Sequence, residues 1–179
     1  MGTSAEEQQF YKNLKKGQRF QDYYSLVLWH ERKKVLCNFQ SHDVQKLIGE
    51  NLQKEEIKYD EVSMDSKNIF IETKERVCGH HNLKPAGIYA QDNPKTYVVG
   101  NYDVIWTFNI ETLQKFHKTN KPEEKPVENK KTGVVTAKGF VLSKKKADEL
   151  CYDKMANLSR RWRQFFPTHI AEKLLQTQT

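Results

Sequence analysis

Two runs of strand-forming residues, separated by a short turn-forming segment, constrain the fold of this chain more than any other feature. The runs cover residues 56–63 and 68–74 and are rich in β-branched and aromatic side chains, which favour strands. The segment between them, Met64-Asp65-Ser66-Lys67, carries the Asp and Ser residues that favour turns. The sequence therefore predicts a β-hairpin.

Helical patterns are expected near both ends of the chain. Apolar residues recur at helical spacing over residues 10–35, which predicts one or two N-terminal helices. A shorter helix is expected over residues 41–53, with Ser41 as its N-cap. Apolar residues at i, i+3 and i+4 also predict a C-terminal amphipathic helix at about residues 143–166.

The middle of the chain combines further strands with a polar segment. Residues 96–99 and 103–108 have the composition of a second hairpin, and Asn109 is placed to cap a short helix after it. Residues 139–142 are expected to form one more strand. Residues 118–131 are charged, contain proline and have almost no apolar side chains, so we expect a mobile loop there.

Length and composition favour one domain. A chain of 179 residues is near the commonest size of a single domain. Although only 37% of the residues are hydrophobic, nine Phe, eight Tyr and three Trp provide enough bulk for a modest core. The elements above predict an α/β fold, with a mixed, mostly antiparallel central sheet flanked by helices.

The charge of the chain favours a polyanionic partner. Thirty Lys and Arg residues outnumber 23 Asp and Glu residues, which gives a formal net charge of +7 and a pI near 9.2. This excess must appear on the surface, where it attracts nucleic acid. DNA is the partner that we expect, although basicity that serves only solubility stays an open alternative.

Cysteine usage and hydropathy indicate the compartment. Cys37, Cys78 and Cys151 are odd in number and widely spaced, which fits neither a disulfide framework nor a paired zinc site. A reducing cytoplasm is therefore expected. No apolar run approaches the ~20 residues of a membrane-spanning helix, so no membrane partner is expected. The sequence does not decide between a monomer and a homodimer.

Charged side chains alternate along the predicted hairpin. Residues two apart in a strand share a face, so Glu72 and Lys74 should point one way, and Lys58 and Asp60 should share a face of their own strand. If the loop consists of residues 65–67, Asp60 lies directly opposite Glu72, and Lys58 lies opposite Lys74. This register is conditional on that loop length.

Two carboxylates held so close repel each other unless a positive charge lies between them. A divalent cation such as Mg²⁺ or Mn²⁺ would supply it, because Mg²⁺ prefers hard oxygen ligands and retains several waters. A metal that activates water and neutralises phosphate, with an adjacent ammonium, suits phosphodiester hydrolysis. A solvated strand face of alternating charges is the alternative.

An Asp followed by Glu-x-Lys in the next strand resembles the metal centre of the PD-(D/E)xK nuclease superfamily, which includes many restriction, repair and phage nucleases. The likeness to a phage-associated group of that superfamily covers roughly residues 45–145. It rests on these segments: Gly49-Glu50-Asn51, Glu56-Ile57-Lys58 with Asp60, Ile71-Glu72, Ala86-Gly87-Ile88-Tyr89, Asp92-Asn93 and Tyr97-Val98-Val99-Gly100-Asn101-Tyr102. It implies a restriction-endonuclease-like core and Mg²⁺-dependent cleavage of DNA.

The chain departs from the family pattern at two places. The turn after the metal-binding hairpin is usually Ser-Gly-Ile-like, and Ala86 replaces the Ser. The strand of the phage group reads Ile-Glu-x-x-Glu-Lys, whereas this chain has Glu72-Thr73-Lys74-Glu75-Arg76 after Ile71. Lys74 is the first choice for the catalytic lysine, because it shares the predicted face of Glu72, and Lys58 is the second.

Superfamily members often add a Glu or Gln from a preceding helix. The resemblance implies Glu50 as a further metal ligand and Gln21 as a supporting group. For both residues, a plain surface role stays an open alternative.

Basic residues in the predicted C-terminal helix are candidates for contact with nucleic acid. Arg and Lys can grip backbone phosphate, and a neighbouring Trp can stack on bases. A solvated helix face is equally compatible with this pattern. The candidates are Lys144, Lys145, Arg160, Arg161 and Arg163.

The hypothesis that follows is a metal-dependent nuclease that hydrolyses DNA phosphodiester bonds through Asp60, Glu72 and a lysine. The alternative is a non-catalytic nucleic-acid-binding or phage interaction protein of the same fold. For a protein of phage origin, the expected compartment is the host cytoplasm.

Overall fold

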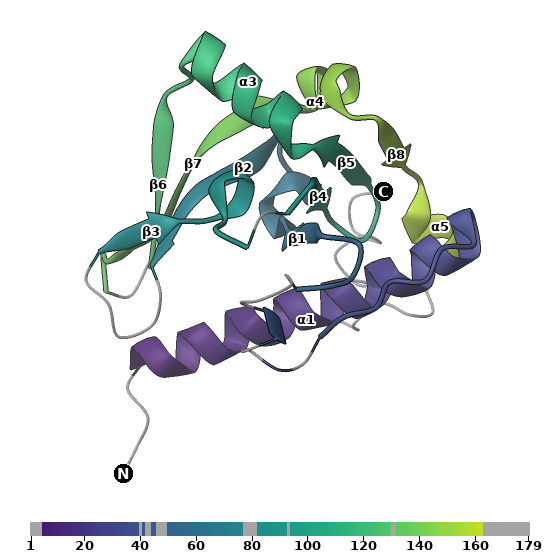
Figure 1. Ribbon diagram of the computed structural model, residues 1–179. Coiled ribbons are helices and arrows are strands. Elements are labelled where there is room, and N and C mark those ends of the chain that lie inside the picture. Colours follow the sequence, from purple (N-terminus) through teal and green to yellow (C-terminus); the bar gives the residue numbers. More distant parts are fainter. Residues whose placement is uncertain are drawn as a thin grey trace.

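The computed structural model of this chain describes residues 5–39, 41, 44–45, 50–76, 82–92, 94–129 and 132–162. Its described strands form two four-stranded sheets (Figure 1). The first contains, in spatial order, β1 (Glu55–Tyr59), β4 (Thr96–Gly100), β5 (Ile105–Asn109) and β8 (Asp153–Met155). The second contains β3 (Leu83–Pro85), β2 (Asn68–Arg76), β7 (Val135–Ser143) and β6 (Glu124–Glu128).

Helices flank these sheets. They are α1 (Ala5–Arg32), α3 (Ile110–Asn120), α4 (Lys144–Leu150) and α5 (Leu158–Trp162), with the short 3₁₀ helices η1 (Glu61–Met64) and η2 (Gly87–Tyr89). Only β1 and β4 pair in parallel, and the other strand pairs of both sheets are antiparallel. The predicted α/β class with mixed, mostly antiparallel pairing is confirmed. The strands are divided between two sheets, however, where the sequence predicted one.

The predicted hairpin over residues 56–74 is wrong. β1 pairs with β4, whereas β2 pairs with β3 and β7, so the two runs belong to different sheets. The segment between them begins with η1, in which Ser63 is buried and donates its backbone N–H to the Asp60 side chain. This short 3₁₀ helix leads the chain from the first sheet to the second. The alternation of side chains along a strand cannot predict it.

The N-terminal helix is confirmed as one continuous element. α1 lies along the first sheet, beneath it in Figure 1, and contributes Phe20, Tyr24 and Val27 to a core with Val98 and Ile105. Aromatic rings and branched side chains at i, i+4 and i+7 make this buried stripe. Within the described part of the chain, no helix is long and apolar enough to cross a membrane.

Residues 42–43 and 46–49 of the shorter helix predicted over residues 41–53 lie outside the described residues. Positions 44–45 are helical. Asn51 forms an isolated bridge with Asn38 instead of continuing a helix, and a turn follows. The C-terminal end of that prediction is therefore wrong.

A second core lies between the two sheets and α3. Ile71 and Phe140 come from the second sheet, Tyr97 and Trp106 come from the first, and Leu113 comes from α3. The predicted hairpin of β4 and β5 is confirmed, as is the strand over residues 139–142 within β7. The cap of α3 is also confirmed, because the Asn109 side chain accepts from the backbone N–H of Glu111.

The segment 118–131 is not the loop that its composition predicted. It contains the end of α3 and all of β6, which pairs with β7. Pro126 has no backbone N–H to donate. It is tolerated because β6 is an edge strand, so the hydrogen bonds between the inner strands of the sheet are not interrupted. Thr73 also donates its hydroxyl to Glu124 at 2.6 Å, which ties this charged strand to β2.

The predicted continuous helix at about residues 143–166 is also wrong. α4 begins at the Ser143 cap and ends at Leu150, after which β8 joins the first sheet beside β5. Asn157 then has a positive φ of 57°, a conformation that breaks the helical path before α5 begins. Two short helices with a strand between them can have the apolar spacing of one long helix.

Gly87 is required where η2 packs against β2. Its φ is +55°, and a Cβ there would collide with the backbone carbonyl of Glu72. Gly87→Ala should therefore lower the free energy of unfolding by about 3 kcal/mol, from left-handed strain plus overpacking. Gly133→Ala is the control, because Gly133 has a φ of +68° but nothing near its Cβ position, and should cost only about 1 kcal/mol. Equal losses in chemical denaturation would contradict this packing.

Candidate metal and catalytic site

A β-bulge in β2 decides which charged side chains face one another. Glu72 is paired with Gly139 of β7, and Lys74 is paired with the adjacent Lys138. Because adjacent residues of a strand lie on opposite faces, Glu72 and Lys74 do so as well. The prediction that they share a face was wrong, because Thr73 is an extra residue that alternation alone cannot reveal.

Lys58, the second choice for the catalytic lysine, is the lysine that contacts Glu72. Its Nζ lies 2.8 Å from Glu56 Oε1, 3.1 Å from Glu72 Oε1 and 4.0 Å from Glu75 Oε2. Glu56 and Lys58 belong to β1, whereas Glu72 and Glu75 belong to β2. One ammonium therefore connects carboxylates of the two sheets. We call these four residues the Lys58 cluster.

The cluster is largely withdrawn from water. Glu56 is buried, and the side chains of Glu72 and Lys58 are 15% and 26% exposed. Burial alone would lower the pKa of Lys58, but Glu56, Glu72 and Glu75 raise it well above its ordinary value. Burial raises the pKa of Glu72, and Lys58 partly opposes that rise. Lys58 is therefore a permanent cation at neutral pH.

Glu50 faces the same cluster from the segment before β1. Burial and the charge of Glu56 raise its pKa to about 7, while Lys58 acts in the opposite direction. Gln21 of α1 donates its side-chain N–H to Glu50 Oε2 at 3.5 Å. The structure therefore places the two accessory candidates, Glu50 and Gln21, next to each other, with Glu50 within electrostatic range of Lys58.

Three acidic residues around Lys58 were not among the predicted site residues. They are Glu56, Glu75 and Asp92, and burial followed by the charge of Glu56 raises the pKa of Asp92. A sequence signal for Glu56 existed, since Glu56-Ile57-Lys58 is itself a Glu-x-Lys pattern in a strand. Asp92 lies in the Asp92-Asn93 segment of the resemblance, but no role was assigned to it, and it follows η2 in the chain.

Asp60 lies at the end of β1 in a different environment. Its Oδ1 accepts the backbone N–H of Ser63 at 3.1 Å, and its Oδ2 accepts that of Phe70 at 2.8 Å. Burial raises the pKa of Asp60 and these N–H groups oppose the rise. Asp60 therefore caps η1 and ties it to β2. The predicted cross-strand opposition of Asp60 and Glu72 is wrong, because their strands do not pair.

Lys74 lies on the far face of β2 from Lys58. Its Nζ is 3.8 Å from Glu124 Oε2 of β6, and its side chain is 47% exposed. The predicted pairing of Lys58 with Lys74 across a hairpin is thus replaced by two separate ion pairs with different carboxylates. Thr73, the extra residue of the bulge, lies between Glu72 and Lys74 in the sequence.

The carboxylates of Glu56 and Glu72 are the pair best placed to hold a cation. Glu72 Oε1 is buried, and apart from its ionic contact with Lys58 it has no partner at hydrogen-bond geometry among the described residues. Two hard oxygen donors suit Mg²⁺, which retains several waters. No three His, Cys, Asp or Glu side chains in the described ranges are grouped as a ready-made metal site.

The predicted nucleic-acid-binding residues are distributed over two helices. Lys144 and Lys145 belong to α4, whereas Arg160 and Arg161 belong to α5, and Arg163 lies outside the described residues. The Nη1 atom of Arg161 forms an ion pair with Glu31 of α1 at 2.8 Å. β8 intervenes between the two helices, so these side chains do not line one helix face.

Comparisons with known proteins do not place the chain in a family. No family model, no curated protein and no solved structure matches it. The arrangement of side chains around Lys58 is therefore the basis on which a function can be argued.

The raised pKa of Glu50 makes a prediction about stability. A folded-state pKa of about 7, above the ordinary 4.5, means that the folded chain binds a proton that the unfolded chain has released. Stability should therefore fall as the pH rises from about 4.5 through about 7, by on the order of 2 kcal/mol. With chelator present, Glu50→Gln should abolish this decrease in the free energy of unfolding. The variant should therefore be more stable than the parent protein at pH 8. Denaturant titrations showing the same pH profile for both proteins would contradict it.

The capping role of Asp60 predicts a loss of stability without metal. Asp60→Asn keeps one acceptor but directs an amide N–H at a backbone donor, so it should cost about 1–2 kcal/mol in chelator. A carboxylate that serves only a metal would behave in the opposite way, because its neutralisation relieves repulsion. Unchanged or increased stability of the variant in thermal unfolding would exclude the cap.

Proposed function

We propose that this chain is a divalent-metal-dependent nuclease that hydrolyses DNA phosphodiester bonds at the Lys58 cluster. The observation that carries the proposal is the convergence of Glu56 and Glu72, from two sheets, on the Nζ atom of Lys58. Two carboxylates and a lysine are also what the PD-(D/E)xK resemblance implies, but here Glu56-x-Lys58 takes the place of Glu72-x-Lys74, and Glu72 takes the place of Asp60. A restriction-endonuclease-like core belongs to the same proposal.

Glu56, Glu72 and Lys58 of the cluster, together with Glu50, have distinct parts in this proposal. Glu56 and Glu72 would hold Mg²⁺ or Mn²⁺ through their carboxylate oxygens. The ion, when bound, would supply an acidified water and charge neutralisation at the phosphate. Lys58, whose neighbouring carboxylates keep it protonated in the metal-free site, stabilises negative charge on the phosphate. Glu50, held by Gln21, is a positioning residue for this set.

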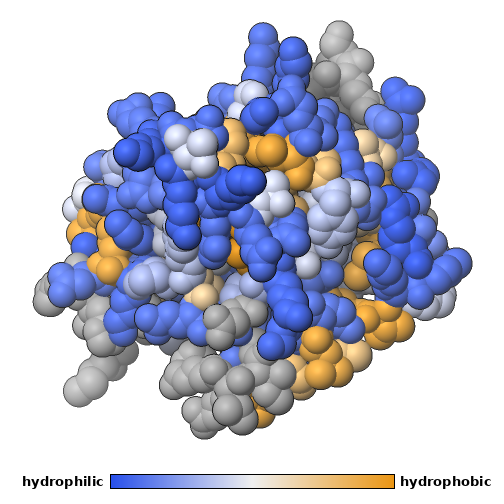
Figure 2. All heavy atoms as spheres, turned by 45° about the horizontal axis from the view of Figure 1, so that its top comes forward, coloured by the Kyte–Doolittle hydropathy of each residue, from blue (hydrophilic) through white to orange (hydrophobic). Residues whose placement is uncertain are grey.

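The surface of the molecule is compatible with a polyanionic substrate. The net charge of +7 favours approach of DNA. Figure 2 shows that hydrophilic side chains cover most of the face on which α3 and α4 come forward. Lys144 and Lys145 of α4 are the candidates for phosphate contact.

Cleavage assays with charge-neutral variants test the proposal. The parent protein should cut plasmid or linear DNA with Mg²⁺ or Mn²⁺ and stop in chelator. Glu56→Gln, Glu72→Gln and Lys58→Met should each reduce cleavage by at least about 100-fold, because each removes a metal ligand or phosphate stabilisation. Lys16→Met and Glu61→Gln are the matched controls, since they break a lysine–glutamate pair elsewhere, with 32% and 36% exposed side chains.

The outcomes separate the competing functions. Equal losses in the cluster variants and the Lys16 and Glu61 controls, or full activity in chelator, would contradict the proposal. Salt-sensitive DNA binding without cleavage under any metal would favour the non-catalytic nucleic-acid-binding protein. Absence of both activities would favour a phage interaction protein.

A further inference from the structure

A second polar cluster lies on the opposite face of β2 from Lys58. The bulge that separates Glu72 from Lys74 places Lys74 directly opposite Lys138 of β7. Like charges directly opposite each other destabilise a sheet. A lysine pair in this position therefore needs an anion beside it.

One carboxylate of the protein partly fills that need. Glu124 of β6 lies 3.8 Å from the Lys74 ammonium and 3.8 Å from His117 Nε2. The Thr73 hydroxyl, followed by the charges of Lys74, His117 and Lys138, lowers the pKa of Glu124. Three basic groups act on this one carboxylate, so the cluster keeps an excess of positive character.

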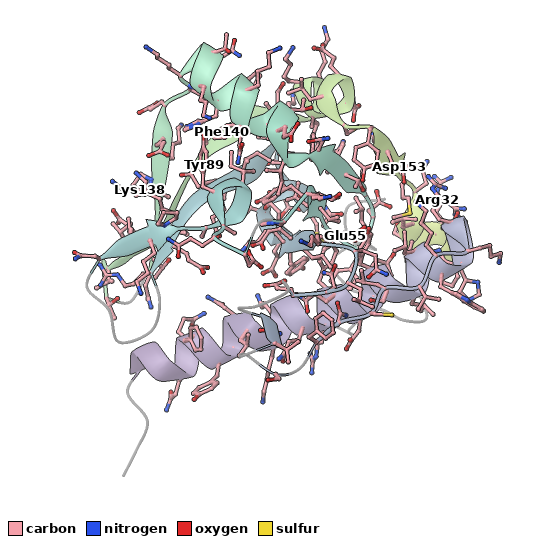
Figure 3. The ribbon with its side chains drawn as sticks, viewed as in Figure 1. Arg32, Glu55, Tyr89, Lys138, Phe140 and Asp153 are labelled. Atoms are coloured by element: carbon pink, nitrogen blue, oxygen red, sulfur yellow. The ribbon has the colours of Figure 1, made fainter. Side chains whose placement is uncertain are left out.

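The donors of this cluster are held in place by packing. The Tyr89 hydroxyl of η2 lies 2.9 Å from His117 Nδ1, and the His117 ring stacks on Phe140 at 5.0 Å with an interplanar angle of 14°. Gln114 of α3 also donates to the carbonyl of Ile88 at 2.7 Å, which fixes η2 against that helix. Figure 3 shows Tyr89, Phe140 and Lys138 on the same side of the molecule, far from Glu55 and Asp153.

We propose that Lys74, Lys138 and His117 form a binding site for a phosphate monoester group, with Tyr89 orienting the His117 ring through its hydroxyl. Two ammonium groups and an imidazole, supplied by β2, β7 and α3, match a tetrahedral dianion that carries three strong acceptor oxygens. Glu124 is the internal competitor for the same donors. The phosphate belongs either to a small phosphorylated compound or to the 5′ end of a nucleic-acid strand, and both present the same chemistry.

Because Glu124 competes with phosphate, the proposal predicts that two kinds of substitution change phosphate affinity in opposite directions. Inorganic phosphate is titrated into the full-length protein in chelator, with binding followed by calorimetry and by the histidine NMR signals. Lys138→Met and Lys74→Met should weaken binding at least about tenfold. Glu124→Gln should tighten it several-fold, because it removes the competing charge. Lys154→Met is the control, since its ammonium pairs with Asp148 elsewhere at 2.7 Å.

Weaker phosphate binding by Glu124→Gln would overturn the proposal, because in a purely structural network every substitution is expected to weaken binding. Binding that does not saturate, or equal effects of Lys138→Met and Lys154→Met, would overturn it as well. Thermal unfolding of each variant confirms that it folds before its affinity is compared.

Matched oligonucleotides identify the source of the phosphate. Competition by a 5′-phosphorylated strand, but not by the same strand with a 5′-hydroxyl, assigns the site to nucleic-acid ends. Competition by neither, with free phosphate still bound, assigns it to a small phosphorylated compound. Equal competition by both strands means that the lysines contact the phosphodiester backbone, which contradicts a monoester site. All arms omit metal, so their outcome is independent of cleavage at the Lys58 cluster.

Discussion

The contact of Lys58 with carboxylates from both sheets is the interaction on which the rest of the site depends. Glu56 and Glu72 would repel each other at this spacing in a half-buried environment, and the Lys58 ammonium between them offsets that repulsion. Because the two acids belong to β1 and β2, the same ion pairs also connect the two sheets. A divalent ion in place of this ammonium would neutralise both carboxylate charges and free Lys58 to meet a phosphate.

The bulge at Thr73 gives β2 two chemically different faces. Glu72 and Glu75 are directed towards the acidic surroundings of Lys58, whereas Lys74 joins the basic surroundings of Glu124. A regular strand would have placed Glu72 and Lys74 side by side and mixed the two clusters. One extra residue thus separates the proposed cation site from the proposed phosphate site across the thickness of a single strand, and bulges often lie near functional sites.

Sequence reasoning succeeded where the signal is local and failed where pairing is long-range. α1, the β4–β5 hairpin and the Asn109 cap were predicted from apolar spacing, turn residues and capping chemistry within a few positions. The hairpin of β1 and β2 was wrong, because β1 finds its partner in β4, some forty residues away. The resemblance pointed to Glu50, Gln21, Lys58 and Glu72, which the fold brings together, but not to the bulge that removes Lys74 from the group.

The central claim is that Glu56 and Glu72 form a cation site in which Lys58 now provides the positive charge. Anomalous diffraction from crystals of the protein soaked in Mn²⁺ tests this most directly, because it locates the ion without reference to activity. The account predicts an anomalous peak in contact with the carboxylates of both Glu56 and Glu72, with the Lys58 ammonium displaced from between them. A map with no peak there and Lys58 still bridging the two acids, or with the ion at Asp60 instead, would contradict it.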